Sequence, residues 1–171
     1  MSGHEVRHAY IGRIVGSAMT ATEHNDAACR TPRHSRVQHL ITADETSLVD
    51  LEALLATLPI CSTGRVFVEV PDESWICDLD VPARMVLTWL DRSRRSGDPG
   101  TGRACAPGQA LARAVTAWAD EMLCTEDDHT LVFLLGGFLG TADIHDHLTG
   151  RLGIASDAIH TPERFGLTAS R

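Results

Sequence analysis

The sequence predicts an α/β fold, a doubly wound parallel sheet of about five strands with helices on both faces. The first observation is that short apolar runs, rich in β-branched and aromatic residues, alternate with stretches whose apolar residues recur at helical spacing. The second is the run at 130–135, which is almost entirely apolar and therefore typical of a strand covered on both faces. The third is size, because 171 residues with 43% apolar content are enough for one domain with a core.

The first strand is predicted at residues 37–42. Residues 43–47 supply the capping and acidic residues typical of a helix start, and apolar residues then recur on one helical face as far as Leu58. Pro59 ends this helix, and a second strand follows at residues 65–70. A strand–helix–strand unit of this size is typical of a right-handed crossover, so the two strands are expected to be parallel, as in Rossmann-like folds.

The later elements repeat this alternation. The acidic, tryptophan-containing segment 71–82 shows no long helical period and is interpreted as a crossover. Gly136 to Gly140 is interpreted as a tight turn, after which Thr141 caps the last helix. The remaining predictions are a strand at 84–90, loops over 91–107, a helix at 108–123, a strand at 130–135 and a short strand near 158–160.

Three segments are predicted along the chain. Residues 1–36 are polar and form an arm or linker with a possible short strand at 8–15. Residues 37–162 form the domain, and 163–171 form a tail. No apolar run reaches the length of a membrane span and no signal peptide is recognised, so the expected location is cytoplasmic.

Charge narrows the possible partners. The chain has 15 basic and 23 acidic residues, for a net charge of −8, which argues against nucleic-acid and anionic-membrane binding. All the basic residues are arginines, which excludes a Schiff-base lysine or a P-loop lysine. Any phosphate must therefore be bound by arginine or by backbone N–H groups.

No metal site is predicted. The five cysteines include no C-x-x-C pair, so a zinc knuckle or a disulfide framework is not expected. His145, Asp146 and His147 fall in a predicted helix, where neighbours two residues apart point to different sides. They are interpreted as a solvated helix face.

Three loops should meet at the carboxyl edge of the sheet, where ligands bind in folds of this kind. In the first, the helix start at 43–47 could attract a phosphate, with Thr46 and Ser47 as donors. Asp44 and Glu45 would repel a bare phosphate unless their side chains turn away. Anion binding and simple capping both remain open for this loop.

The other two loops also allow two interpretations each. Arg92, Arg94 and Arg95 could grip a phosphate, or form a solvated loop paired with Asp91 and Asp98. Gly136 and Gly137 could let the backbone approach a ligand, or simply connect a strand to a helix. Phe138 could lie against a flat ring or join the core.

Several stretches resemble motifs of one family, the siderophore-interacting proteins. Residues 40–48 resemble its "L-x-x-G-D-E-T-A-L-P" segment, and 64–70 resemble its second strand, "G-x-V-F-I-E-V". Residues 86–92 are similar to its third strand, "V-x-V-T-W-L-H-R", and 131–143 occupy the place of "Y-V-W-A-A-G-E-A-S-A-V-R". The order and spacing agree from about residue 37 to residue 159.

The resemblance is to the carboxyl-terminal half of that family, a ferredoxin-reductase-like domain. It implies binding of NADPH or NADH, whose hydride passes to a flavin held by a β-barrel, and the flavin in turn reduces ferric siderophores. Arg92 would lie at the adenosine ribose phosphate. The resemblance and the three loops together give the residues expected at the nucleotide: Thr42, Asp44, Glu45, Thr46, Ser47, Arg92, Arg94, Gly136, Gly137 and Phe138. No catalytic residue is expected on this chain.

The family's flavin barrel does not fit into the residues that precede 37. FAD is therefore expected only through a partner domain or protein, and a ferric siderophore only indirectly. Ala43 stands where the family has glycine, and Gly137 stands where it has glutamate. The change at Gly137, together with the missing flavin domain, favours a different hypothesis. The alternative is a degenerate, non-catalytic binding or regulatory module.

Overall fold

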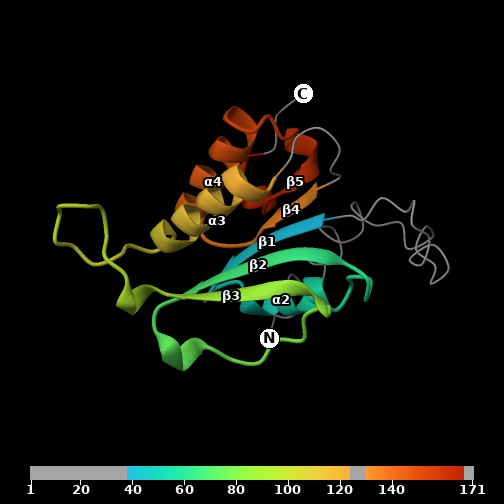
Figure 1. The fold of residues 1–171 in the computed structure, drawn as a ribbon, viewed down its shortest axis with the longest axis horizontal. Coiled ribbons are helices and arrows are strands. Elements are labelled where there is room, and N and C mark those ends of the chain that lie inside the picture. The colour runs from blue at the N-terminus through green and yellow to red at the C-terminus, as the bar shows by residue number, and fades with distance from the viewer. Residues whose placement is uncertain (1–37, 124–129, 168–171) are drawn as a thin grey trace, which may run out of the picture.

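The computed structural model describes residues 38–123 and 130–167 (Figure 1). The arm expected over residues 1–36, with its possible strand, lies outside the described residues. The elements, in which η marks a 3₁₀ turn, are β1 (Gln38–Asp44), α2 (Leu48–Leu55), β2 (Thr63–Val70), η2 (Glu73–Trp75), β3 (Arg84–Asp91), η3 (Arg92–Arg94), α3 (Gln109–Met122), β4 (Thr130–Leu134), α4 (Phe138–Gly150), η4 (Ser156–Ala158), β5 (Ile159–His160) and η5 (Glu163–Phe165).

The strands form one five-stranded sheet in the order β3-β2-β1-β4-β5, and every neighbouring pair is parallel. This confirms the predicted doubly wound fold. The chain leaves β1 towards β2 and β3, and later returns to the other side of β1 through β4 and β5. The reversal places a topological switch point between β1 and β4, where ligands bind in open α/β sheets.

Two apolar layers cover the sheet. On one face, α2 packs with the crossover between β2 and β3, and its leucines contact Ile41 and Val66. On the other face, α3 and α4 pack together over Leu40 and Phe67. Figure 1 shows α2 on the opposite side of the sheet from α3 and α4. The alternation of Leu40 and Ile41 between the two layers follows from the period of two in a strand.

The structure corrects two predicted boundaries. The helix α2 ends at Leu55, earlier than the predicted end at Leu58. The helix α4 begins at Phe138, so 138–140 are helical and Thr141 is not the cap. Instead, Thr141 is buried in the first turns, and its hydroxyl donates to the Gly136 carbonyl at 3.2 Å. The cap of α4 comes from another strand, described below.

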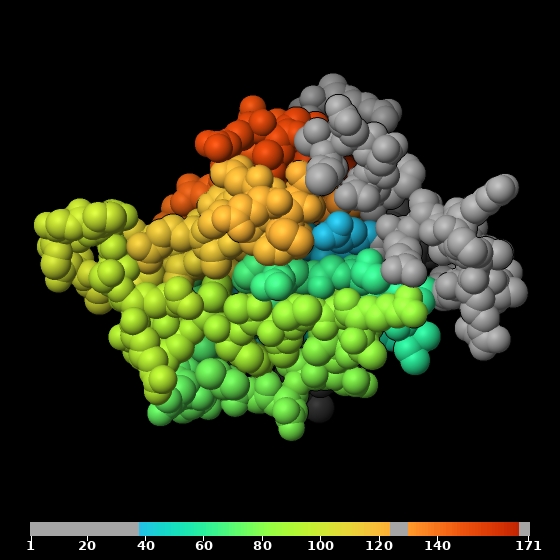
Figure 2. All heavy atoms as spheres, in the orientation of Figure 1, coloured from blue at the N-terminus to red at the C-terminus, as the bar shows by residue number. Residues whose placement is uncertain are grey.

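The starts of α3 and α4 touch at two glycines. Gly108 precedes α3 with a φ of +82°, which favours glycine, and a Cβ there would lie 2.8 Å from the Gly140 nitrogen. A Cβ on Gly140 would lie 2.9 Å from the Gly108 Cα. Figure 2 shows the two helices packed closely along one side of the molecule, with the loop at 97–105 projecting away. This close approach brings two helix N-termini to the carboxyl edge of the sheet.

Residues 163–165, part of the expected tail, form η5. No helix in the described ranges is long and apolar enough to cross a membrane.

Candidate functional site at the carboxyl edge of the sheet

The carboxylate of Asp44, the last residue of β1, joins the first and third predicted loops. Its Oδ2 accepts a hydrogen bond of 2.6 Å from the N–H of Gly137, which precedes α4. Its Oδ1 accepts from the Thr46 N–H and hydroxyl at 3.0 and 2.7 Å, and from the Ser47 hydroxyl at 3.2 Å. Asp44 therefore caps α4 from a neighbouring strand, and its charge is directed at donors within the protein.

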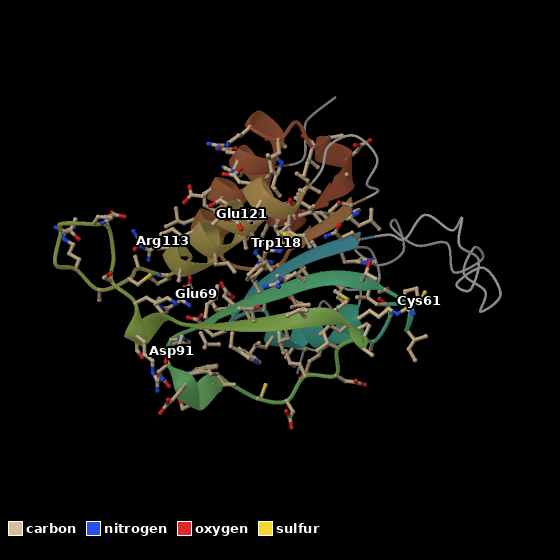
Figure 3. The ribbon with its side chains drawn as sticks, in the orientation of Figure 1. Cys61, Glu69, Asp91, Arg113, Trp118 and Glu121 are labelled. Atoms are coloured by element: carbon tan, nitrogen blue, oxygen red, sulfur yellow. The ribbon has the colours of Figure 1, made fainter. Side chains whose placement is uncertain are left out.

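Glu69 lies opposite Asp44 in the β1–β2 register and is fully buried. Its Oε1 accepts from the N–H of Gly108, and its Oε2 accepts from the N–H of Leu111, both at 2.8 Å. Glu69 thus caps α3, and Figure 3 shows it beside the start of that helix. None of the three predicted loops includes Glu69. A lone carboxylate in an apolar strand is nevertheless a signal, because a buried charge needs a partner.

Arg92, the first residue after β3, lies between two carboxylates. Its Nη1 donates to Glu69 Oε1 at 2.9 Å, and its Nη2 donates to Glu45 Oε1 at 3.1 Å. The Arg92 side chain is only 14% exposed and that of Glu45 is 20% exposed. Partial burial acts to lower the pKa of Arg92, but the hydrogen bonds and charges of Glu69 and Glu45 outweigh it and raise the pKa. Arg92 is therefore a permanent cation.

The carboxyl ends of β2 and β3 carry matching turns. Asp72 accepts hydrogen bonds from the N–H and the hydroxyl of Ser74, and Asp91 accepts the same two bonds from Ser93. The two aspartates thereby cap η2 and η3. The N–H of Ser93 also donates to the Pro71 carbonyl at 3.0 Å. The two turns are therefore held together beside Arg92.

The second loop is held partly by its own acidic neighbours. Arg94 forms ion pairs with Glu73 and, at 3.1 Å, with Asp91, and its side chain is 68% exposed. Asp98 instead accepts from the Gln109 amide at 2.6 Å. Arg94 is therefore paired and solvated, as one of the two interpretations of this loop predicts. The Arg92 side chain instead lies against the sheet edge, where it is largely buried.

The first turn of α2 differs from those of α3 and α4. Ser47 is the N-cap of α2, but its side chain makes no capping bond to that helix. Its hydroxyl accepts from the Asp44 N–H at 2.9 Å instead. Thr46 and Val49 are exposed beside this turn. The start of α2 therefore keeps backbone N–H groups available next to the switch point.

The other predicted residues occupy different depths. Thr42 is fully buried within β1, two residues short of the edge, and its hydroxyl has no hydrogen-bond partner among the described residues. Gly136 is buried, with Leu111 Cδ2 3.3 Å from where its Cβ would lie. Phe138 is about half-exposed, and its ring meets Phe165 edge-on at 5.5 Å. Thr42 and Gly136 are therefore covered by other residues, whereas Phe138 is accessible at the edge.

The histidines of α4 lie apart from this edge. His145 is buried, so the interpretation of a solvated helix face is wrong for it. His147 Nε2 is 2.8 Å from Asp120 Oδ1 on α3. Within residues 38–123 and 130–167, no group of three or more metal-ligating side chains comes together.

A groove of about 600 Å³ lies at the opposite, amino edge of the sheet, between α2 and the crossover that leads to β3. Leucines, Ile60 and Val81 contribute its apolar lining, and Glu52, Asp78 and Asp80 add carboxylates. It contains none of the predicted site residues. Its position also argues against it, because ligands of this fold bind at the carboxyl edge.

Three solved structures share the fold. SipS, a siderophore-interacting protein from Aeromonas hydrophila, matches with a TM-score of 0.55 and 18% identity, over 74% of this chain and 49% of that one. A siderophore utilization protein from T. fusca matches with a TM-score of 0.55 and 24% identity, over 72% of this chain and 42% of that one. The siderophore-interacting protein from Acinetobacter baumannii matches with a TM-score of 0.53 and 9% identity, over 75% of this chain and 45% of that one. The matched region is less than half of each of these proteins.

The family model for siderophore-interacting proteins matches residues 37–162. This span contains all the strands of the sheet and each of the three loops at its carboxyl edge. The motifs at 40–48, 64–70 and 86–92 had already indicated the same family. The chain belongs to the siderophore-interacting protein family.

Proposed function

We propose that this domain binds a nicotinamide nucleotide, NADH or NADPH, across the carboxyl edge of its sheet and presents it to a flavin held by a partner domain or protein. The observation that carries the proposal is the convergence of three distant loops at the switch point. Asp44 reaches Gly137 across 93 residues, and Glu45 reaches Arg92 across 47. The family relationship supports a role in iron acquisition, in which the ferric siderophore would be the final electron acceptor.

The residues at this edge fit such a ligand. The carboxylates that would repel a diphosphate already have partners within the protein, because Asp44 accepts from four donors and Glu45 pairs with Arg92. The start of α2 offers backbone N–H groups to an anion. Gly137 is exposed and presents its backbone without a side chain, which lets a ligand approach closely. Phe138, half-exposed beside it, offers an aromatic surface.

When bound, the nicotinamide would supply a hydride to the partner's flavin. The residues of this chain would bind and orient the nucleotide, since hydride transfer depends on proximity more than on an acid or a base. The α2 turn would hold the diphosphate and Arg92 would lie towards the adenosine ribose. The glycine turn before α4 would line the path towards the nicotinamide.

A second candidate, a non-catalytic binding module, is favoured by one observation. Arg92 already donates to two carboxylates, and the N-termini of α3 and α4 are capped by Glu69 and Asp44. These groups could therefore serve the fold alone. The two candidates differ in whether the folded domain binds nicotinamide nucleotides.

Titration of the folded protein with NADH and NADPH, followed by nicotinamide fluorescence, separates them. Saturable binding is expected. Val49→Asp should weaken it roughly fivefold or more, because a carboxylate on the first turn of α2 repels the diphosphate while suiting the helix dipole. Ile60→Asp is the matched control, since it adds the same charge at an equally exposed site on the opposite edge.

Absence of binding at millimolar nucleotide, with the fold verified by circular dichroism, would contradict nucleotide binding and favour the non-catalytic module. Equal weakening by Val49→Asp and Ile60→Asp would show that binding occurs elsewhere. For the transfer step, oxidation of bound NADH is expected only when a flavin-carrying partner protein is added.

A further inference from the structure

We propose that Glu45 is a built-in competitor for Arg92, and that it makes the nucleotide site prefer the unphosphorylated ribose of NADH over the 2′-phosphate of NADPH. This inference rests on the proposed function and names a specificity-determining residue for it. The geometry around Arg92 carries it. Arg92 extends from the end of β3 to Glu69 on β2 and to Glu45 beyond β1, so its guanidinium lies across the end of β2.

The two carboxylates on Arg92 are held very differently. Glu69 is fully buried, and its two oxygens accept from Gly108, Leu111 and Arg92. Glu45 is partly exposed and has a single bond, from Arg92 to its Oε1, while its buried Oε2 has no hydrogen-bond partner among the described residues. Glu69 is therefore a fixed anchor, and Glu45 is the partner that an incoming anion can displace.

A 2′-phosphate that binds the Nη2 of Arg92 would take the place of Glu45. It would then lie near Glu69 as well, whose charge cannot leave because it caps α3. Like charges placed side by side in a partly buried site are strongly unfavourable. A ribose hydroxyl meets no such repulsion, and a carboxylate near the ribose is the feature that accompanies NAD in related dinucleotide folds.

The other two arginines of the second loop are weaker anchors for a phosphate. Arg94 is tied to Glu73 and Asp91 and is largely exposed, so its attraction is screened by solvent. Arg95 is exposed as well. Among the arginines of the second loop, Arg92 is therefore the one whose partners we expect to decide between the two nucleotides.

The test is to measure dissociation constants for NADH and NADPH with the native protein, Glu45→Gln and Glu73→Gln. The native protein should bind NADH about tenfold more tightly than NADPH. Glu45→Gln should tighten NADPH binding by about tenfold without tightening NADH binding, since it removes the charge that opposes the 2′-phosphate and keeps the shape. Glu73→Gln, which removes a carboxylate from Arg94 instead, should leave the ratio of the two constants unchanged.

Each outcome decides the inference. A native preference for NADPH, or a Glu45→Gln variant that affects both nucleotides equally, would overturn it while leaving nucleotide binding intact. Failure of either nucleotide to bind any of the three proteins would overturn the proposed function, and this inference with it. Should Glu45→Gln fail to fold, Glu45→Ser provides the same comparison, because the ratio of the constants does not depend on overall stability.

Discussion

Asp44 and Glu69 lie opposite each other on adjacent parallel strands, and each caps a different helix. Asp44 binds the N–H of Gly137 before α4, and Glu69 binds the N–H groups of Gly108 and Leu111 at the start of α3. One rung of the sheet thus fixes two helix N-termini that also touch each other. Asp44 also holds the turn that precedes α2, through its bonds to Thr46 and Ser47.

Among the carboxylates at this edge, Glu69 should contribute most to the free energy of unfolding. We expect Glu69→Gln to lower the free energy of unfolding by about 3 kcal/mol, because it leaves Arg92 without its buried partner and places an amide donor against backbone donors. Urea denaturation measures the change. Glu52→Gln, an exposed change on α2, is the control and should be close to neutral.

Asp44→Asn should cost less, about 1 kcal/mol, since the side chain keeps one oxygen acceptor while its amide opposes one of the donors. Its effect should be local, with faster amide hydrogen exchange at Gly137 and in the first turn of α4. Asp143→Asn, an exposed change on the same helix, serves as the control. Unchanged exchange at Gly137 would show that Asp44 does not hold this turn.

The contact between Gly108 and Gly140 gives a steric prediction. Gly140→Ala places a methyl group 2.9 Å from the Gly108 Cα and should destabilise the fold by roughly 1–3 kcal/mol. Gly150→Ala, at the other end of the same helix, meets no atom within 4 Å and should be neutral or slightly stabilising. Thermal unfolding compares the two. Equal effects would contradict the close approach of α3 and α4.

Two histidines predict a pH dependence. His39 on β1 and His160 on β5 flank Phe133, with ring centroids 6.3 and 4.8 Å from it. Burial lowers the pKa of both below the ordinary 6.5; for His39 a hydrogen bond to the Thr63 carbonyl acts weakly in the opposite direction. The folded state therefore prefers neutral histidine. Its contribution to stability is complete above pH 6.5 and is lost as the pH falls through the lowered values.

Chemical denaturation between pH 7.5 and pH 5.5 tests this, in a range above the titration of ordinary carboxylates. The native protein should lose stability as the pH falls. His39→Phe, which keeps a ring beside Phe133, should lose less over the same range. A variant with the same slope as the native protein would contradict the role of His39.

The strands could be predicted because the apolar pattern that marks a buried strand lies within a few consecutive residues. A strand covered on both faces must be apolar along its length, so β2 and β4 are visible as runs of branched and aromatic residues. The parallel order follows from the lengths of the crossovers. The ends of these strands located the three loops at the carboxyl edge, and the family motifs fall on the same loops.

The caps could not be predicted because their partners are distant in the sequence. Thr141 satisfies the local rule for a helix start, yet the Asp44 carboxylate, 93 residues before Gly137, starts α4 at Phe138 instead. Glu69 looks like one residue of a strand, and its partner Leu111 is 42 residues away. Likewise, the sequence identified Arg92 as a cation but did not show that two carboxylates already hold it.

The most direct test of nucleotide binding at this edge is an NMR titration of the ¹⁵N-labelled protein with NADH. The predicted result is saturable shifts of the backbone amides at 44–49, 91–95 and 136–139, with little change around the groove lined by Leu55, Leu58 and Val81. Shifts confined to that groove, or no shifts at millimolar NADH, would contradict it.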